Sequence, residues 1–149
     1  MNIRIEGRLP TALGITKARA LQGARLFARL SGSRIGAQFQ DVTVIVQDDA
    51  SSAGAHLAIM GVEGATDVIT QQYDPMPGEE PGVYGELYVN AEQALRVARK
   101  SRGWSSAKEF LLYIAHGMDH LSGADDHSNE DYARMRRREL SWLRQFTSN

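Results

Sequence analysis

The chain has 149 residues, of which 42 % are hydrophobic, a size and composition that suit one domain with its own core and exclude two ordinary domains. It has no cysteine, which excludes disulfides and thiolate zinc sites, so a tight metal site must use His, Asp and Glu. The formal net charge is -1, and neither a signal-peptide pattern nor an apolar run of about 18 residues is present, so we expect a cytoplasmic protein that does not associate with membranes.

The hydrophobic pattern predicts strands and helices along the whole chain. Strands show period-two alternation or runs of β-branched residues, and helices repeat apolar side chains every three or four positions. In the first half, we expect a strand at 2–6, an amphipathic helix from Thr11 or Thr16 to Leu30, a loop at 31–36, a strand at 40–49 covered on both faces, and a short helix ended by Gly61. In the second half, we expect strands at 66–70 and 84–90, a helix at 91–101, a helix opened by the capping box of Ser106 and Glu109 and ended by Gly123, and a last helix at 128–146.

The charges are unevenly distributed along the sequence. Residues 1–34 carry seven bases and one acid, residues 35–90 carry nine acids and no base, and residues 91–149 carry ten bases and eight acids. The basic segments are typical either of solvated helix faces or of a patch that contacts phosphate groups, and composition alone leaves both interpretations open.

The stretch AHGMDHLSGADDH at 115–127 holds three of the four histidines. Residues four apart on a helix project from the same face, so His116 and His120 are placed to hold one metal ion. Zinc requires a third protein ligand, and Gly123 can turn the chain back after the helix so that a later residue reaches the same ion. Asp126 and His127 are both candidates for that third ligand.

The spacing is also similar to that of the zinc-peptidase helices. Those enzymes need a Glu directly after the first His as general base. Here that position is Gly117, which argues against peptide hydrolysis by the usual route.

The same residues resemble the YbeY family of zinc-dependent endoribonucleases and rRNA maturation factors. The family hallmark HGxLHLxGYDH is matched by His116, Gly117, His120, Leu121, Gly123 and Asp125. Further matches to the family pattern are Thr66, Asp67 and Val68 in one strand, Gly85, Glu86, Val89, Asn90, Glu92 and Ala94 in the next strand and helix, and Glu109, Leu111, Met135 and Glu139 in the last two helices. The resemblance covers most of residues 40–140.

This resemblance implies a fold, a cofactor and an activity. The expected fold is α+β, a small mixed four-stranded sheet packed with about five helices in a single domain over 1–149, with the metal site on a helix. One Zn²⁺ is expected at His116, His120 and Asp126, where the ungapped alignment places the third family histidine on Asp126 and leaves His127 as the alternative ligand. The implied activity is endonucleolytic hydrolysis of single-stranded rRNA precursor by metal-activated water, with ribosomal components as partners.

The sequence departs from the family pattern at positions that matter for catalysis. Asp119 replaces a Leu and is a candidate to orient a ligand or accept a proton, or is a solvent-facing carboxylate. Many members carry an arginine shortly before TDV that is thought to face the substrate phosphate, and residues 56–65 contain none. Positive charge would then come from the ion or from basic helix residues, namely Arg96, Arg99, Lys100, Arg102 and the cluster at 134–138.

Two alternative functions remain open on these grounds. The missing arginine favours a non-catalytic ribosome-associated maturation factor with a structural metal. Gln71 and Asp119, which depart from the family pattern, favour a metallohydrolase that acts on another substrate.

Overall fold

The computed structural model describes residues 1–148. In chain order the elements are β1 (Asn2–Glu6), the 3-10 turn η1 (Thr11–Leu13), α1 (Lys17–Ile35), β2 (Phe39–Gln47), α2 (Asp49–Ala55), the π-helical turn η2 (His56–Met60), β3 (Val68–Tyr73), β4 (Val83–Asn90), α3 (Ala91–Val97), α4 (Ser106–Leu121) and α5 (Asn129–Thr147). None of the helices within 1–148 combines the length and hydropathy that a membrane crossing requires.

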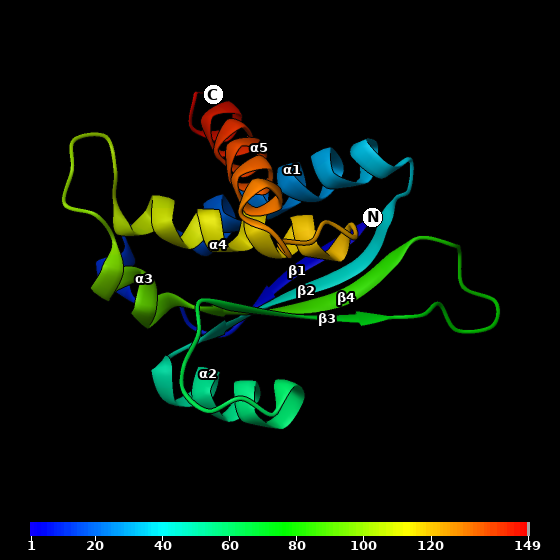
Figure 1. Cartoon of the computed structure of the whole chain (residues 1–149), viewed down its shortest axis with the longest axis horizontal. Coiled ribbons are helices and arrows are strands. Elements are labelled where there is room, and N and C mark those ends of the chain that lie inside the picture. The colour runs from blue at the N-terminus through cyan, green and yellow to red at the C-terminus, as the bar shows by residue number, and fades with distance from the viewer. Residues whose placement is uncertain (149) are drawn as a thin grey trace.

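The four strands form one mixed sheet in the order β1-β2-β4-β3. β1 pairs with β2 and β2 with β4 in parallel, whereas the edge strand β3 is antiparallel to β4. α1 and α4 lie on one face of the sheet with α5 beyond them, and α2 lies on the other face (Figure 1). This architecture confirms the expected α+β class with a four-stranded mixed sheet and five α-helices.

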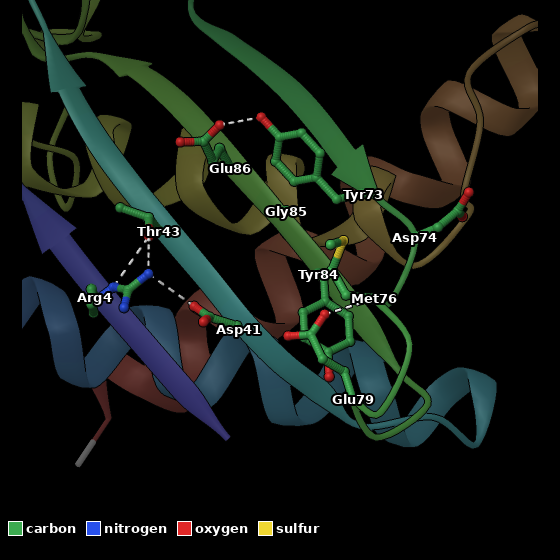
Figure 2. A pocket seen from close by; sticks show the side chains of 10 residues that line it. All are labelled: Arg4, Asp41, Thr43, Tyr73, Asp74, Met76, Glu79, Tyr84, Gly85 and Glu86. Atoms are coloured by element: carbon green, nitrogen blue, oxygen red, sulfur yellow. Dashed lines mark hydrogen bonds and ion pairs between the residues drawn. The ribbon is translucent and has the colours of Figure 1, made fainter.

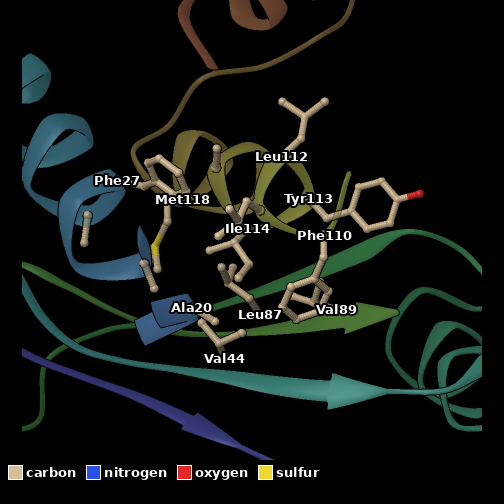
Figure 3. Packing of buried hydrophobic residues seen from close by; sticks show 14 of the residues in the cluster. Ala20, Phe27, Val44, Leu87, Val89, Phe110, Leu112, Tyr113, Ile114 and Met118 are labelled. Atoms are coloured by element: carbon tan, nitrogen blue, oxygen red, sulfur yellow. The ribbon is translucent and has the colours of Figure 1, made fainter. Parts of the chain in front are cut away.

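The core lies between α4, α1 and the sheet. Apolar side chains from α4 point toward the strands, where Phe110 and Ile114 meet Leu87 and Val89 (Figure 3). These four side chains are almost completely buried, and each such burial contributes about 1.5–3 kcal/mol to folding. The packing therefore fixes α4, and with it the histidines of its last turns, against β4 and β3.

The structure corrects the expected end of the first helix. The predicted loop at 31–36 is helical as far as Ile35, and the helix stops at Gly36, whose φ of 67° is left-handed. Ser31 and Gly32 are buried within α1. These small residues suggested a loop, but in the structure they lie on a close-packed face of the helix. Glycine at position 36 is required because most other residues are strained at this φ.

The second strand and the cap of α4 also differ from the sequence prediction. The strand at 40–49 is central, but one of its faces is only partly covered. Val42 and Val44 face the helices, whereas on the opposite face Thr43 is buried and Asp41 lines an open hollow. The cap of α4 is Ser105, whose hydroxyl accepts from the amide of Lys108, and the prediction of Ser106 as the cap was wrong.

Gly117 gives a test of how tightly α4 packs on the sheet. A Cβ added there would lie 2.9 Å from both methyl carbons of Leu87 and 3.2 Å from a methyl carbon of Val68. We expect Gly117→Ala to lower the free energy of unfolding by about 1–3 kcal/mol through overpacking. Gly54→Ala is the matched control, since its Cβ would meet nothing within 4 Å, and it should stabilise by about 0.5–1 kcal/mol through helix propensity. Urea denaturation measures both changes, and equal stability of the two variants would contradict this packing.

Candidate metal centre

The last turns of α4 and the bend that follows position the candidate metal ligands. α4 ends at Leu121, and the amides of Gly123 and Ala124 then donate to the carbonyls of His120 and Asp119 at 2.9 and 3.2 Å. Gly123 adopts a φ of 93°, a conformation that turns the chain back beside the helix it has just left. The bend brings the segment after Gly123 to the side of α4 that carries the histidines.

The imidazoles of His116 and His120 face each other across one helical turn. Their Nε2 atoms lie 3.0 Å apart. Nδ1 of His116 lies 2.8 Å from a carboxylate oxygen of Glu139, and Nδ1 of His120 lies 3.0 Å from the carbonyl oxygen of Ala124. Both partners accept hydrogen bonds, so each neutral ring carries its proton on Nδ1 and directs the Nε2 lone pair toward the other ring.

Asp126 completes a group of three candidate ligands. Its Oδ2 lies 3.9 Å from Nε2 of His120, and one ligand atom from each of His116, His120 and Asp126 falls within 4.8 Å of the others. Two imidazole lone pairs and a carboxylate that converge on one point fit a divalent cation, which would remove the repulsion between them. The donor set suits zinc and other divalent ions of the first transition row.

The alternative ligand His127 lies outside this group. Its side chain is 82 % exposed, and its Nε2 lies 2.7 Å from a carboxylate oxygen of Asp125. The geometry therefore favours Asp126 as the third ligand.

Glu139 from α5 supports the first histidine. Its side chain is fully buried, one carboxylate oxygen pairs with His116, and the other, Oε1, has no hydrogen-bond donor within the described residues, with Arg136 at 3.8 Å. Burial lowers the pKa of His116, but the hydrogen bond and charge of Glu139 outweigh it, so the pKa of His116 is raised. A carboxylate behind a ligand histidine fixes the ring and increases its basicity toward a metal.

Asp119 is fully buried and is not solvent-facing. Its carboxylate accepts from the guanidinium of Arg138 on α5 at 2.9–3.1 Å and lies 3.8 Å from Arg34 on α1. Burial raises the pKa of Asp119 to about 6, although the hydrogen bonds from Arg138 act in the opposite direction. These contacts connect α4 to α5 and α1, so the side chain acts as an anchor between helices.

Removing Arg138, the partner of Asp119, should lower the free energy of unfolding more than removing the charge of Asp119. We expect Arg138→Ala to lower the free energy of unfolding by about 3 kcal/mol, because it leaves a buried carboxylate without its main donor. Asp119→Asn keeps an acceptor for Arg138 and should cost about 1 kcal/mol. Chemical denaturation at neutral pH compares the two, and the anchor assignment is wrong if Arg138→Ala is the more stable variant.

The two imidazoles open into a cleft of about 270 Å³. Seven residues line it: His56 and Met60 from η2, Val68, Ile69 and Thr70 from β3, and His116 and His120 from α4. The lining contains no arginine or lysine. The cleft therefore combines a candidate metal centre with a largely apolar wall along the edge strand.

A larger hollow of about 560 Å³ lies on the open face of the sheet. In Figure 2, Tyr73 points toward Glu86 across this face, and Arg4 reaches Thr43 and Asp41. Its lining carries four acids, Asp41, Asp74, Glu79 and Glu86, against the single base Arg4. This charge opposes a polyanion, so the smaller cleft is the better site for a phosphodiester.

Glu139 and His56 were missed as site residues by sequence reasoning. Glu139 shares the buried stripe of α5 with Met135, Trp142, Leu143 and Phe146. A glutamate at an apolar position of an amphipathic helix is a signal of a paired, buried charge, and it could have indicated the role of Glu139. His56 carries no comparable local signal, because it lies 60 residues before His116 in the sequence.

Fold and site together define an α+β protein with a candidate metal centre beside the sheet edge. Residues 16–147 match the family described as Endoribonuclease YbeY. The chain belongs to the YbeY family.

Individual relatives agree with this assignment. Proteins named Endoribonuclease YbeY from Rhodopirellula baltica and Thermus thermophilus are 36 % and 33 % identical over 104 residues, which is 69 % of this chain and 52 % and 74 % of theirs. The relative from Kineococcus radiotolerans is 34 % identical over 113 residues, 69 % of this chain and 65 % of its own length. The chain thus spans about half to three quarters of these relatives.

A solved structure is similar in fold. The solution structure of TM1509 from Thermotoga maritima matches with a TM-score of 0.61 and 22 % identity, over 97 % of this chain and 87 % of that one. At this identity the similarity supports the architecture alone.

Proposed function

We propose that the chain is a zinc-dependent endoribonuclease of the cytoplasm that cleaves single-stranded rRNA precursor during ribosome maturation. The whole chain would form a single domain. The observation that carries the proposal is the pair of Nε2 atoms 3.0 Å apart, each presented by a ring whose Nδ1 is held by an acceptor. His116, His120 and Asp126 would hold one Zn²⁺. Family membership and the names of the relatives support ribonuclease activity.

Residues in and behind the cleft would bind and orient an RNA backbone. When bound, the cation would polarise the phosphodiester and lower the pKa of a water molecule. Glu139 would hold the ring of His116 in place, and the carbonyl of Ala124 would do the same for His120. The apolar wall of Met60, Val68 and Ile69 would exclude other water from the reacting group.

Positive charge for the substrate would come from α5 and not from the cleft wall. Arg138, Arg134 and Arg96 are each paired with an aspartate, at Asp119, Asp131 and Asp49. Arg136 lies 3.8 Å from Glu139, the carboxylate that supports His116, and packs on the ring of Tyr132. We therefore expect it to contribute to RNA affinity through the phosphates.

The test is a cleavage assay with metal-loaded protein on single-stranded and duplex RNA of the same sequence. We expect cleavage of the single strand, its loss when a chelator removes the metal, and its return when zinc is added. Cleavage that persists without metal would overturn the proposal.

A second candidate function is a ribosome-associated maturation factor with a structural metal. It is favoured by the absence of arginine and lysine from the cleft lining. Metal-loaded protein that binds rRNA precursor and never cleaves it would support this alternative. The burial of Asp119 and the absence of Gln71 from the cleft lining argue against the other alternative, a metallohydrolase that acts on another substrate.

A further inference from the structure

His56 lines the same cleft as the two imidazoles of the candidate metal centre. It begins the π-helical turn η2 that continues α2, and such turns occur often at functional sites. Of the seven residues that line the cleft, His56 is the only titratable one besides His116 and His120. It is outside the group of candidate ligands, which contains only His116, His120 and Asp126 among residues 1–148.

The ring of His56 is held in one orientation by the chain after η2. Its Nδ1 lies 2.8 Å from the carbonyl oxygen of Gly64. A carbonyl only accepts, so Nδ1 carries the proton of the neutral ring and Nε2 keeps a lone pair. Nε2 makes no hydrogen bond with any other part of residues 1–148, so it is available as an acceptor for a ligand in the cleft.

An acceptor at this place selects for a donor on the substrate. Phosphate oxygens of a nucleic acid do not donate at neutral pH. The donor nearest to any phosphodiester in RNA is the ribose 2′-hydroxyl, and DNA lacks it. A phosphodiester bound at the imidazole pair brings its own ribose into the cleft, where the remaining wall is apolar apart from Thr70.

We propose that His56 determines sugar specificity, with Nε2 accepting a hydrogen bond from the 2′-hydroxyl next to the bound phosphodiester. This inference rests on the proposed ribonuclease function. It assigns a substrate contact to η2, whereas the candidate ligands all come from α4 and the bend after it.

The test compares two substitutions at His56 on two substrates. Asn places its amide nitrogen near Nδ1 and keeps the contact to Gly64, but it has nothing at the place of Nε2. Gln reaches the position of Nε2 with an acceptor oxygen. The substrates are a single-stranded RNA and the same strand with 2′-fluoro sugars, which lack the donor.

For the wild type we expect kcat/KM to be about tenfold higher on RNA than on 2′-fluoro RNA, the effect of one hydrogen bond. His56→Asn should lose about tenfold on RNA and show no preference between the substrates. His56→Gln should recover part of the preference. Metal content and melting temperature should be unchanged in His56→Asn.

A merely structural role gives a different result. If His56 serves only to hold Gly64, His56→Asn keeps the full preference for RNA, and that outcome overturns the inference. Binding of both oligonucleotides by fluorescence anisotropy gives a second readout. If the wild type binds RNA without cleaving it, the proposed function fails, and the loss or retention of the binding preference in His56→Asn still decides the role of His56.

Discussion

His116→Ala is expected to reduce RNA cleavage by about a thousandfold and bound metal to a small fraction of one equivalent. Only His120 and Asp126 would then remain as ligands, and two ligands are too few for tight zinc binding. A metal ion stabilises a phosphoryl transition state by several kcal/mol, and losing that stabilisation corresponds to a roughly thousandfold slower reaction. Elemental analysis and a cleavage assay on the same preparation measure both effects.

The matched control is His127→Ala. This histidine follows Asp126 in the chain, but its side chain is 82 % exposed and points to Asp125. We expect its metal content and activity to equal those of the wild type. If His127→Ala loses the metal while Asp126→Ala keeps it, the third ligand has been assigned to the wrong residue.

Glu139→Gln is expected to weaken metal affinity by about 10–100-fold and to lower cleavage at limiting metal in proportion. The glutamine keeps the size of the side chain and an acceptor for Nδ1 of His116, but it removes the negative charge that raises the pKa of that histidine. Competition with a chelator of known affinity measures the change.

Glu139→Gln should not lower the stability of the metal-free protein, although it weakens metal binding. The carboxylate of Glu139 is fully buried, and one of its oxygens lacks a hydrogen-bond donor within 1–148. Charge in that setting is costly, so the metal-free Glu139→Gln protein should be at least as stable as the metal-free wild type. An unchanged metal affinity together with a lower melting temperature would show that Glu139 is only a packing residue.

The candidate ligands could be predicted from sequence because their relation is local. His116 and His120 are separated by one helical turn, and Gly123 alone accounts for the bend that returns Asp126. The choice between Asp126 and His127 depends on where each side chain points after the bend. Sequence spacing does not contain that information.

The supporting residues could not be predicted because tertiary packing brings them in. Glu139 is 23 residues after His116 in the chain, and it reaches the ring only because α5 packs on α4. Asp119 departs from the family pattern, and its position next to the histidines suggested a chemical role. In the structure its carboxylate is buried and contacts Arg138 and Arg34 from two other helices, which the sequence pattern did not indicate.

The strand pattern predicted the sheet, but it did not predict that the face opposite α4 is partly open to solvent. Runs of β-branched residues in β2 indicated burial on both sides, and one side proved to carry Arg4, Asp41 and Glu86 around a hollow. Tertiary context decides how far a strand face is covered, and here a single short helix, α2, lies on that face (Figure 1).

Anomalous X-ray scattering at the zinc edge, from crystals of protein purified without added chelator, tests the central claim most directly. The account predicts one peak per chain, bonded to Nε2 of His116, Nε2 of His120 and a carboxylate oxygen of Asp126. A site bonded to His127, or metal-loaded crystals with no peak between the two imidazoles, would contradict it.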